Sequence, residues 1–181
     1  GYVGAIFDAP LEYPALASIM AVIFYSIQIY CDFSGYSDMA IGMGMMFGIR
    51  TKENFLTPYF SKNIKEFWKR WHISLSSWFM DYVYIPIGGN RKGEARRIIN
   101  LMIVFFLSGL WHGASLTFVL WGILNGFFVI VFDRIFKAGK GINSFIVFIS
   151  WSLSLILFRA PDVNSVAEFT KHLFEYNGID M

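Results

Sequence analysis

An uncharged run of 35 residues, 98–132, constrains the fold of this chain more than any other feature. A straight α-helix over this run would be about 50 Å long, because each residue adds about 1.5 Å. The hydrocarbon core of a bilayer is only about 30 Å thick. One membrane span therefore cannot hold the run, and we expect one helix to break near Gly109 and Gly113 and a second helix to follow.

The break leaves a single histidine, His112, inside the apolar run. An ionisable side chain at membrane depth is a functional-site candidate by default. Low-dielectric surroundings disfavour the charged imidazolium, so the neutral ring stays available as a base. Trp111 supplies a flat wall beside it, and Gly113 leaves room for a substrate chain. The alternative role of a lone intramembrane histidine is a hydrogen bond that ties two helices together.

The composition is typical of helical membrane proteins. The chain is 56% hydrophobic and 15% charged, whereas soluble domains carry about a quarter charged residues. Aromatic residues make up 19% of the chain, and Trp and Tyr favour membrane interfaces. We therefore expect an all-α, polytopic membrane protein. Because the chain starts with Gly1 and ends soon after an apolar segment, we also expect residues 1–181 to be a single membrane domain and a piece of a longer chain.

The positive charge is concentrated in one segment. Eight of the 15 Lys and Arg residues lie in residues 62–97. Positively charged loops tend to stay in the cytoplasm, so we expect this segment to be cytoplasmic; a phosphate-bearing ligand is the alternative explanation. The one cysteine, Cys31, excludes an internal disulfide, and its place at the end of an apolar segment predicts a buried thiol.

The remaining pattern predicts short helices joined by polar turns. Residues 15–31 predict a short span, residues 32–38 a turn, and residues 39–49 a partial or re-entrant helix. In residues 62–82, apolar side chains recur every three or four positions, opposite a face of cations, which predicts one amphipathic helix lying in the membrane interface. His72 lies at the edge of its apolar face. The polar tail carries the third histidine, His172, for which we expect no functional role.

Other classes of site find little support in the sequence. There is no HExxH, CxxC or Cys-His cluster, so we expect no metal site. No G-x-S-x-G nucleophile elbow is present. Residues 88–93 resemble a phosphate-binding loop in composition but lack its spacing, and a surface turn is the better interpretation. Asp81 is a candidate proton carrier, although a carboxylate near a helix end is more often a cap or an ion-pair partner. A basic segment in so apolar a chain does not indicate nucleic-acid binding.

An ordered series of motifs runs through residues 30–126. These motifs are FSGYSDMAIG at 33–42, ENF at 53–55 with PY at 58–59, EFWKRWHISLS at 66–76, DYVYIPIGGNR at 81–91, and GLWHGA at 109–114. The series resembles the membrane-bound O-acyltransferase family, and within it the bacterial branch of alginate O-acetylation and teichoic-acid D-alanyl transfer proteins. The resemblance implies a multi-pass enzyme of the bacterial cytoplasmic (inner) membrane whose short, re-entrant and interfacial helices surround a tunnel.

The resemblance also implies the roles of particular residues. His112 corresponds to the family's catalytic histidine, and His72 to a second functional histidine. The residues that we expect to bind the donor or line the tunnel are Lys69, Arg70, Trp71, Asp81, Trp111, Gly113 and Asn125. Where the family pattern has another His-Gly pair, this chain has Asn125 and Gly126, which argues against a third functional histidine there.

The predicted function is therefore acyl transfer across the membrane. His112 would act as the general base on a hydroxyl group that attacks an acyl thioester. We expect acetyl as the acyl group and acetyl-CoA or a pantetheinyl carrier protein as the donor, with no permanently bound cofactor. The acceptor would be an exported polysaccharide or a periplasmic relay partner. The alternatives are D-alanyl transfer to teichoic acid, a non-catalytic subunit that transports an acyl group or solute, and an inert scaffold subunit.

Overall fold

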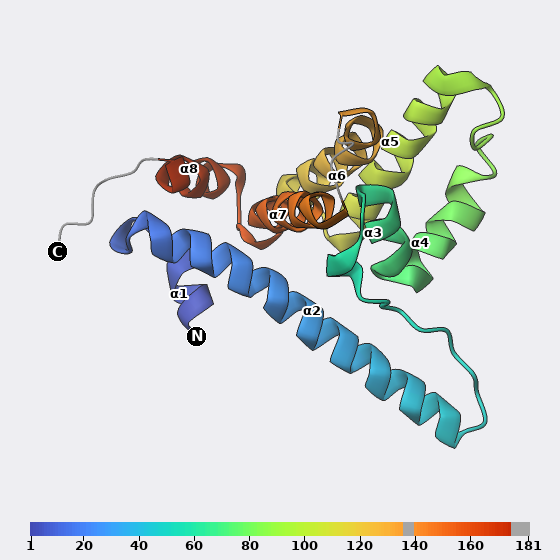
Figure 1. Ribbon diagram of the computed structural model, residues 1–181, viewed down its shortest axis with the longest axis horizontal. Coiled ribbons are helices and arrows are strands. Elements are labelled where there is room, and N and C mark those ends of the chain that lie inside the picture. Colours follow the sequence, from blue (N-terminus) through green and yellow to red (C-terminus); the bar gives the residue numbers. More distant parts are fainter. Residues whose placement is uncertain (136–139, 175–181) are drawn as a thin grey trace.

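The computed structural model describes residues 1–135 and 140–174, with the side chains of residues 1–132 and 142–174. The regular elements in these ranges are all helices, which confirms the all-α prediction. Figure 1 shows a body formed by α3 to α7 and a long helix, α2, that projects away from it. Among the described residues, two helices, Ala15–Met46 and Ile142–Arg159, are long and apolar enough to cross a bilayer.

The N-terminal part consists of α1 (Tyr2–Asp8), a short 3-10 turn (Pro10–Glu12) and α2 (Ala15–Met46). The prediction of a turn at residues 32–38 was wrong, because α2 continues through them. Polar residues and Gly in a helix interior each cost at most about 1 kcal/mol relative to Ala, too little to stop a long helix. The helix ends instead before Gly48, whose φ of +74° suits glycine. Cys31 is exposed, not buried as predicted.

The predicted amphipathic helix over residues 62–82 is broken into three pieces. These are α3 (Ile64–Arg70), α4 (Ile73–Phe79) and a π-helical turn, η3 (Met80–Tyr84). His72 stands between α3 and α4 in the left-handed conformation, with φ of 46°. The single-helix prediction was therefore wrong, and its apolar face is divided: Trp71 is buried in the core, whereas Trp78 is half-exposed.

Helices α5 (Gly93–His112) and α6 (Leu116–Ile135) form a tight hairpin. A Cβ atom at Gly109 would lie 2.3 Å from the Phe118 carbonyl oxygen, and one at Gly122 would lie 2.2 Å from the Phe105 carbonyl oxygen. Only glycine allows the two backbones to come this close. Helix α5 ends at His112, so the predicted break is confirmed at Gly113. Gly109 lies inside α5, so the break does not extend to it.

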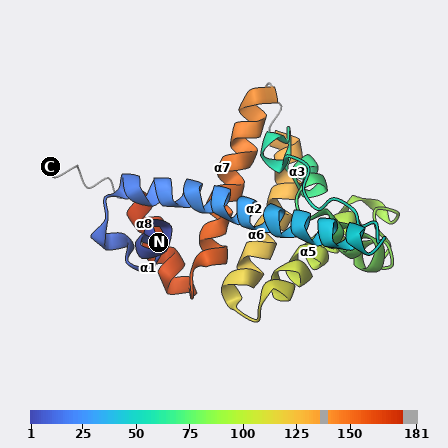
Figure 2. The same ribbon diagram turned by 90° about the horizontal axis from the view of Figure 1, so that it is seen from below.

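The C-terminal part of the described chain consists of α7 (Lys140–Arg159) and α8 (Val163–Phe174). Helix α7 contacts both α6 and α2, and Figure 2 shows it crossing the line of α2. Its buried Trp151 joins the aromatic core formed with Phe67, Trp71 and Trp121. Helix α8 packs against the N-terminal part, where the ring nitrogen Nε2 of His172 lies 2.9 Å from the Tyr13 carbonyl oxygen. His172 thus contacts the N-terminal part of the chain and not the segments that carry the other two histidines.

Candidate functional site

The candidate site is a cavity of about 700 Å³ among α3, α4, η3, α5 and α6. Its lining includes both His72 and His112, which are 40 positions apart in the sequence. Each histidine stands at or beside the end of a helix, His112 as the last residue of α5 and His72 in the break between α3 and α4. The cavity is the place where these two helix ends meet.

His72 is held by the extended segment that precedes α3. The Ile73 amide donates to the Asn54 carbonyl at 3.0 Å, and the Ser74 amide donates to the Asn54 side-chain oxygen at 3.1 Å. These bonds replace helical bonds across the break. Phe33 of α2 covers one side of the imidazole, with ring centroids 4.6 Å apart. His72 is consequently half-buried and fixed from two directions.

His112 is surrounded by aromatic rings. The ring centroids of Trp121 and Phe158 both lie 5.1 Å from that of His112, and the planes of Trp121 and His112 are almost perpendicular. In the described part of the chain its imidazole has ring contacts but no hydrogen bond. No described side chain therefore competes with a substrate for its ring nitrogens.

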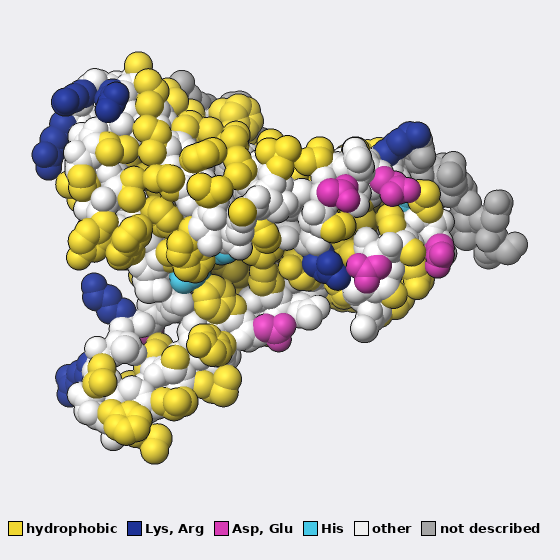
Figure 3. Space-filling model, turned by 180° about the vertical axis from the view of Figure 1, so that it is seen from behind, with side chains coloured by type: hydrophobic (Ala, Val, Ile, Leu, Met, Phe, Trp, Pro, Cys, Tyr) yellow, Lys and Arg dark blue, Asp and Glu magenta, His cyan; other side chains and the backbone are white. Residues whose placement is uncertain are grey.

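Trp111 connects the two histidines. Its ring centroid lies 6.1 Å from that of His72 and 4.9 Å from that of His112. Its side chain is 58% exposed, so it lies at the surface beside the histidines and does not belong to the core. Figure 3 shows histidine side chains at the base of a recess between the projecting end of α2 and the body. A ligand in this recess would therefore reach the histidines from outside.

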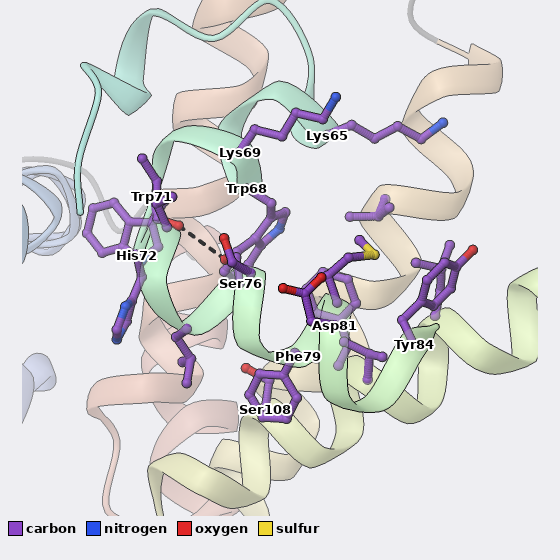
Figure 4. A pocket seen from close by; sticks show the side chains of 18 of the residues that line it. Lys65, Trp68, Lys69, Trp71, His72, Ser76, Phe79, Asp81, Tyr84 and Ser108 are labelled. Carbon is purple, nitrogen blue, oxygen red and sulfur yellow. Dashed lines mark hydrogen bonds between the residues drawn. The ribbon is translucent and has the colours of Figure 1, made fainter. Parts of the chain in front are cut away.

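The other side of the cavity carries cations. Lys65 and Lys69 of α3 belong to its lining, as does Asp81 of η3. In Figure 4 the ammonium ends of Lys65 and Lys69 lie at the top of the view, away from His72 at the left, and Asp81 lies near the centre below the lysines. The cavity thus has a cationic end and a histidine end, joined by the apolar surface of residues such as Trp68.

Four of the residues predicted to bind the donor or line the tunnel are not in this lining: Arg70, Trp111, Gly113 and Asn125. Arg70 turns away and pairs with Glu66 at 2.7 Å. The Lys62 backbone amide, and to a smaller extent the Arg70 guanidinium, lower the pKa of the Glu66 carboxyl. Gly113 makes room for the ring of Phe118. Asn125 is fully buried and donates to the Trp121 carbonyl at 2.9 Å.

Three of the predicted donor or tunnel residues do line the cavity, namely Lys69, Trp71 and Asp81. The lining also includes Trp68, Ser76 and Trp121, which the sequence patterns did not single out as site residues. The apolar periodicity of residues 62–82 includes Trp68, so its packing could be predicted, but its place in a cavity could not. Among the described residues, no three His, Cys, Asp or Glu side chains are grouped to hold a metal ion.

Comparison with known proteins gives one family match and several relatives. A sequence profile of the MBOAT, membrane-bound O-acyltransferase family, matches residues 6–146. A probable alginate O-acetylase of Pseudomonas putida is 43% identical over 84% of this chain and 32% of its own length. A peptidoglycan O-acetyltransferase of Helicobacter pylori is 39% identical over 97% of this chain and 35% of its own.

The name of a third relative indicates a different acyl group. A teichoic acid D-alanyltransferase of Bacillus subtilis is 34% identical over 69% of this chain and 33% of its own length. The chain therefore spans about a third of the length of the curated relatives that it matches.

Proposed function

Because this chain belongs to the membrane-bound O-acyltransferase family, we propose that the membrane protein of which it forms part transfers an acetyl group from a thioester donor to a hydroxyl group. The observation that carries the proposal is the cavity that brings together His72 and His112. Two histidines, a cationic end and an apolar passage between them suit a reaction that joins a phosphate-bearing donor to a separate acceptor.

In this proposal His112 is the general base. A nitrogen of its neutral imidazole takes the proton of the acceptor hydroxyl, while the hydroxyl oxygen attacks the carbonyl carbon of the thioester. The bond from carbon to sulfur then breaks, and the proton passes from the imidazolium to the departing thiolate. The ring walls of Trp121 and Phe158 limit the positions that the imidazole can take, which favours catalysis by keeping the base in place.

His72 would orient the donor or stabilise the charge that develops on the carbonyl oxygen. The ammonium groups of Lys65 and Lys69, at the other end of the cavity, would attract the phosphates of acetyl-CoA or of a pantetheinyl carrier protein. Since cytoplasmic segments are enriched in Lys and Arg, residues 62–97 would face the cytoplasm of the bacterial inner membrane. The donor would then enter from the cytoplasm, with no cofactor bound permanently.

The acceptor would be an exported polysaccharide, reached directly or through a periplasmic relay partner. The names of two relatives, an alginate O-acetylase and a peptidoglycan O-acetyltransferase, support acetyl as the group and a polysaccharide as the acceptor. The similarity to a teichoic acid D-alanyltransferase supports D-alanyl transfer as the second candidate. Chemical analysis of the acyl groups on surface polymers, with and without the intact gene, separates the two.

The decisive variant is His112→Ala in the full-length protein. We expect it to abolish polymer acylation and the donor-dependent release of free thiol by the purified protein, while membrane insertion stays intact. His172→Ala is a matched control, because His172 is a histidine whose contact with Tyr13 lies outside the cavity. Acylation that persists in the His112 variant would refute the assignment. Acyl passage without any thiol release would favour a transport role instead.

A further inference from the structure

The left-handed turn at His72 depends on one residue that the proposed mechanism does not use, Asn54. Outside glycine, the left-handed conformation is uncommon and costs free energy. Its neighbours must therefore hold it in place. Asn54 supplies this support twice: its backbone carbonyl accepts from the Ile73 amide at 3.0 Å, and its side-chain Oδ1 accepts from the Ser74 amide at 3.1 Å.

Asn54 is in turn anchored to α2. Its side-chain Nδ2 donates to the hydroxyl of Ser37 at 3.2 Å, and Ser37 is buried. The orientation of the Asn54 amide is not ambiguous, because the Ser74 amide can only donate and must therefore face Oδ1. The segment that holds His72 is thus attached to α2 on one side and to the start of α4 on the other.

The same contacts favour one position for the ring proton of His72. The Ser74 hydroxyl donates to Asn54 Oδ1 at 3.0 Å, so its one proton is already used. The Ser74 oxygen can therefore only accept from the Nδ1 of His72, which lies 3.4 Å away. This contact favours the tautomer with the proton on Nδ1, which leaves Nε2 as the nitrogen with a free lone pair.

We propose that Asn54 is a positioning residue for His72: it holds the left-handed turn and, through the Ser74 hydroxyl, selects the tautomer with the proton on Nδ1. The kinetic part of this inference rests on the proposed acyl-transfer reaction. In that reaction Nε2 of His72 accepts a hydrogen bond from the acyl donor. The amide N–H groups of a pantetheine arm and the hydroxyl groups of a coenzyme can both donate to this lone pair.

The kinetic test is a double-mutant cycle in the full-length protein. Asn54→Ala should lower kcat by about a hundredfold, the loss that a misplacement of about 1 Å produces. In a His72→Ala background the same substitution should cause no further loss, because Asn54 acts only through His72. Losses that multiply in the double variant would overturn the proposal, since they would show that Asn54 acts independently of His72.

Ser74 and Asn63 provide the controls. Ser74→Ala removes the hydroxyl between Asn54 and His72, and Ser74→Thr restores one, so we expect kcat to fall by about tenfold in the first and to stay near the wild-type value in the second. Asn63→Ala removes a contact of the same kind, from the Glu66 amide to an asparagine Oδ1, but away from His72. Equal loss in Asn54→Ala and Asn63→Ala, or no rescue by threonine, would contradict the proposal.

Hydrogen exchange separates this inference from the proposed function. In Asn54→Ala the amides of residues 72–76 should exchange faster than in the wild type and in Asn63→Ala, whether or not the protein transfers acyl groups. Unchanged exchange in these amides would refute the support of the turn by Asn54. If exchange rises as expected while His112→Ala retains full activity, the structural role of Asn54 holds and the proposed chemistry fails.

Discussion

Replacement of Gly109 by alanine tests whether the α5–α6 hairpin positions His112. The new Cβ atom would lie 2.3 Å from the Phe118 carbonyl oxygen and 3.3 Å from the Gly122 Cα, whereas real Cβ atoms do not come closer than 3.0 Å to their neighbours. The backbones of α5 and α6 would therefore have to separate by at least about 0.7 Å. The atoms in the way belong to backbone, so a rotated side chain cannot relieve the clash.

The expected effects of Gly109→Ala are loss of stability and loss of activity. Overpacking of this kind costs about 1–3 kcal/mol. Because His112 lies three residues further along the same helix, a shift approaching 1 Å should also lower the acyl-transfer rate by up to about a hundredfold. The assays are the thermal unfolding of the purified protein in detergent and the rate of thiol release from the acyl donor.

Gly42→Ala is the matched control. Gly42 also lies in a helix, α2, but a Cβ atom there would have no neighbour within 4 Å. Alanine should be neutral or slightly stabilising at that position, since its helix propensity is about 1 kcal/mol better than that of glycine. The close crossing of α5 and α6 does not position His112 if Gly109→Ala has the unfolding temperature and thiol-release rate of the wild type. The same holds if Gly42→Ala loses as much stability and activity as Gly109→Ala.

Two further predictions concern the charges of α3. Lys69→Ala should raise the KM for acetyl-CoA severalfold without a change in kcat, and added salt should reduce the difference in KM from the wild type. The Arg70 side chain pairs with Glu66 outside the cavity. Arg70→Ala should therefore cost about 1 kcal/mol of stability and leave KM unchanged. The pKa of Glu66 is lowered from 4.5 by the Lys62 amide and then by Arg70, so its stabilising contribution is present above pH 4.5 and is lost as the pH falls through the lowered value. Glu66→Gln should therefore melt below the wild type at pH 7, and the difference should disappear in acid; a difference that persists in acid would contradict this sign.

The position of His112 at a helix end could be predicted from the sequence, because the helix break that produces it has a local cause. An uncharged run too long for one span must break, and Gly113 is the residue at which it does. The sequence could not predict the break at His72 from periodicity. The apolar spacing continues across residues 62–82, and the hydrogen bonds that replace the helix come from Asn54, 20 positions before Ser74. A long-range contact of this kind overrides a local pattern without leaving a periodic trace.

The same distinction explains the division of the predicted donor residues. Lys69 and Arg70 are neighbours with the same charge, so composition and spacing treat them alike. Consecutive positions on a helix point in different directions, and Lys69 lines the cavity while Arg70 bonds to Glu66 and contacts the oxygens of Leu56 and Thr57. Which of two adjacent cations serves the site depends on what packs around α3, and that information lies in segments distant in the sequence.

The relative position of the two histidines depends on one further contact. His112 is the last residue of α5 and His72 follows α3 closely, so their separation depends in part on the junction at which α3 meets α5 and α6. Trp68 of α3 occupies that junction, with its ring centroid 5.2 Å from that of Phe105 and 6.0 Å from that of Trp121. Trp121 also contacts His112. Trp68 and Trp121 thus form a continuous aromatic path from α3 to His112, and the distance across the cavity is determined by packing and not by either helix end alone.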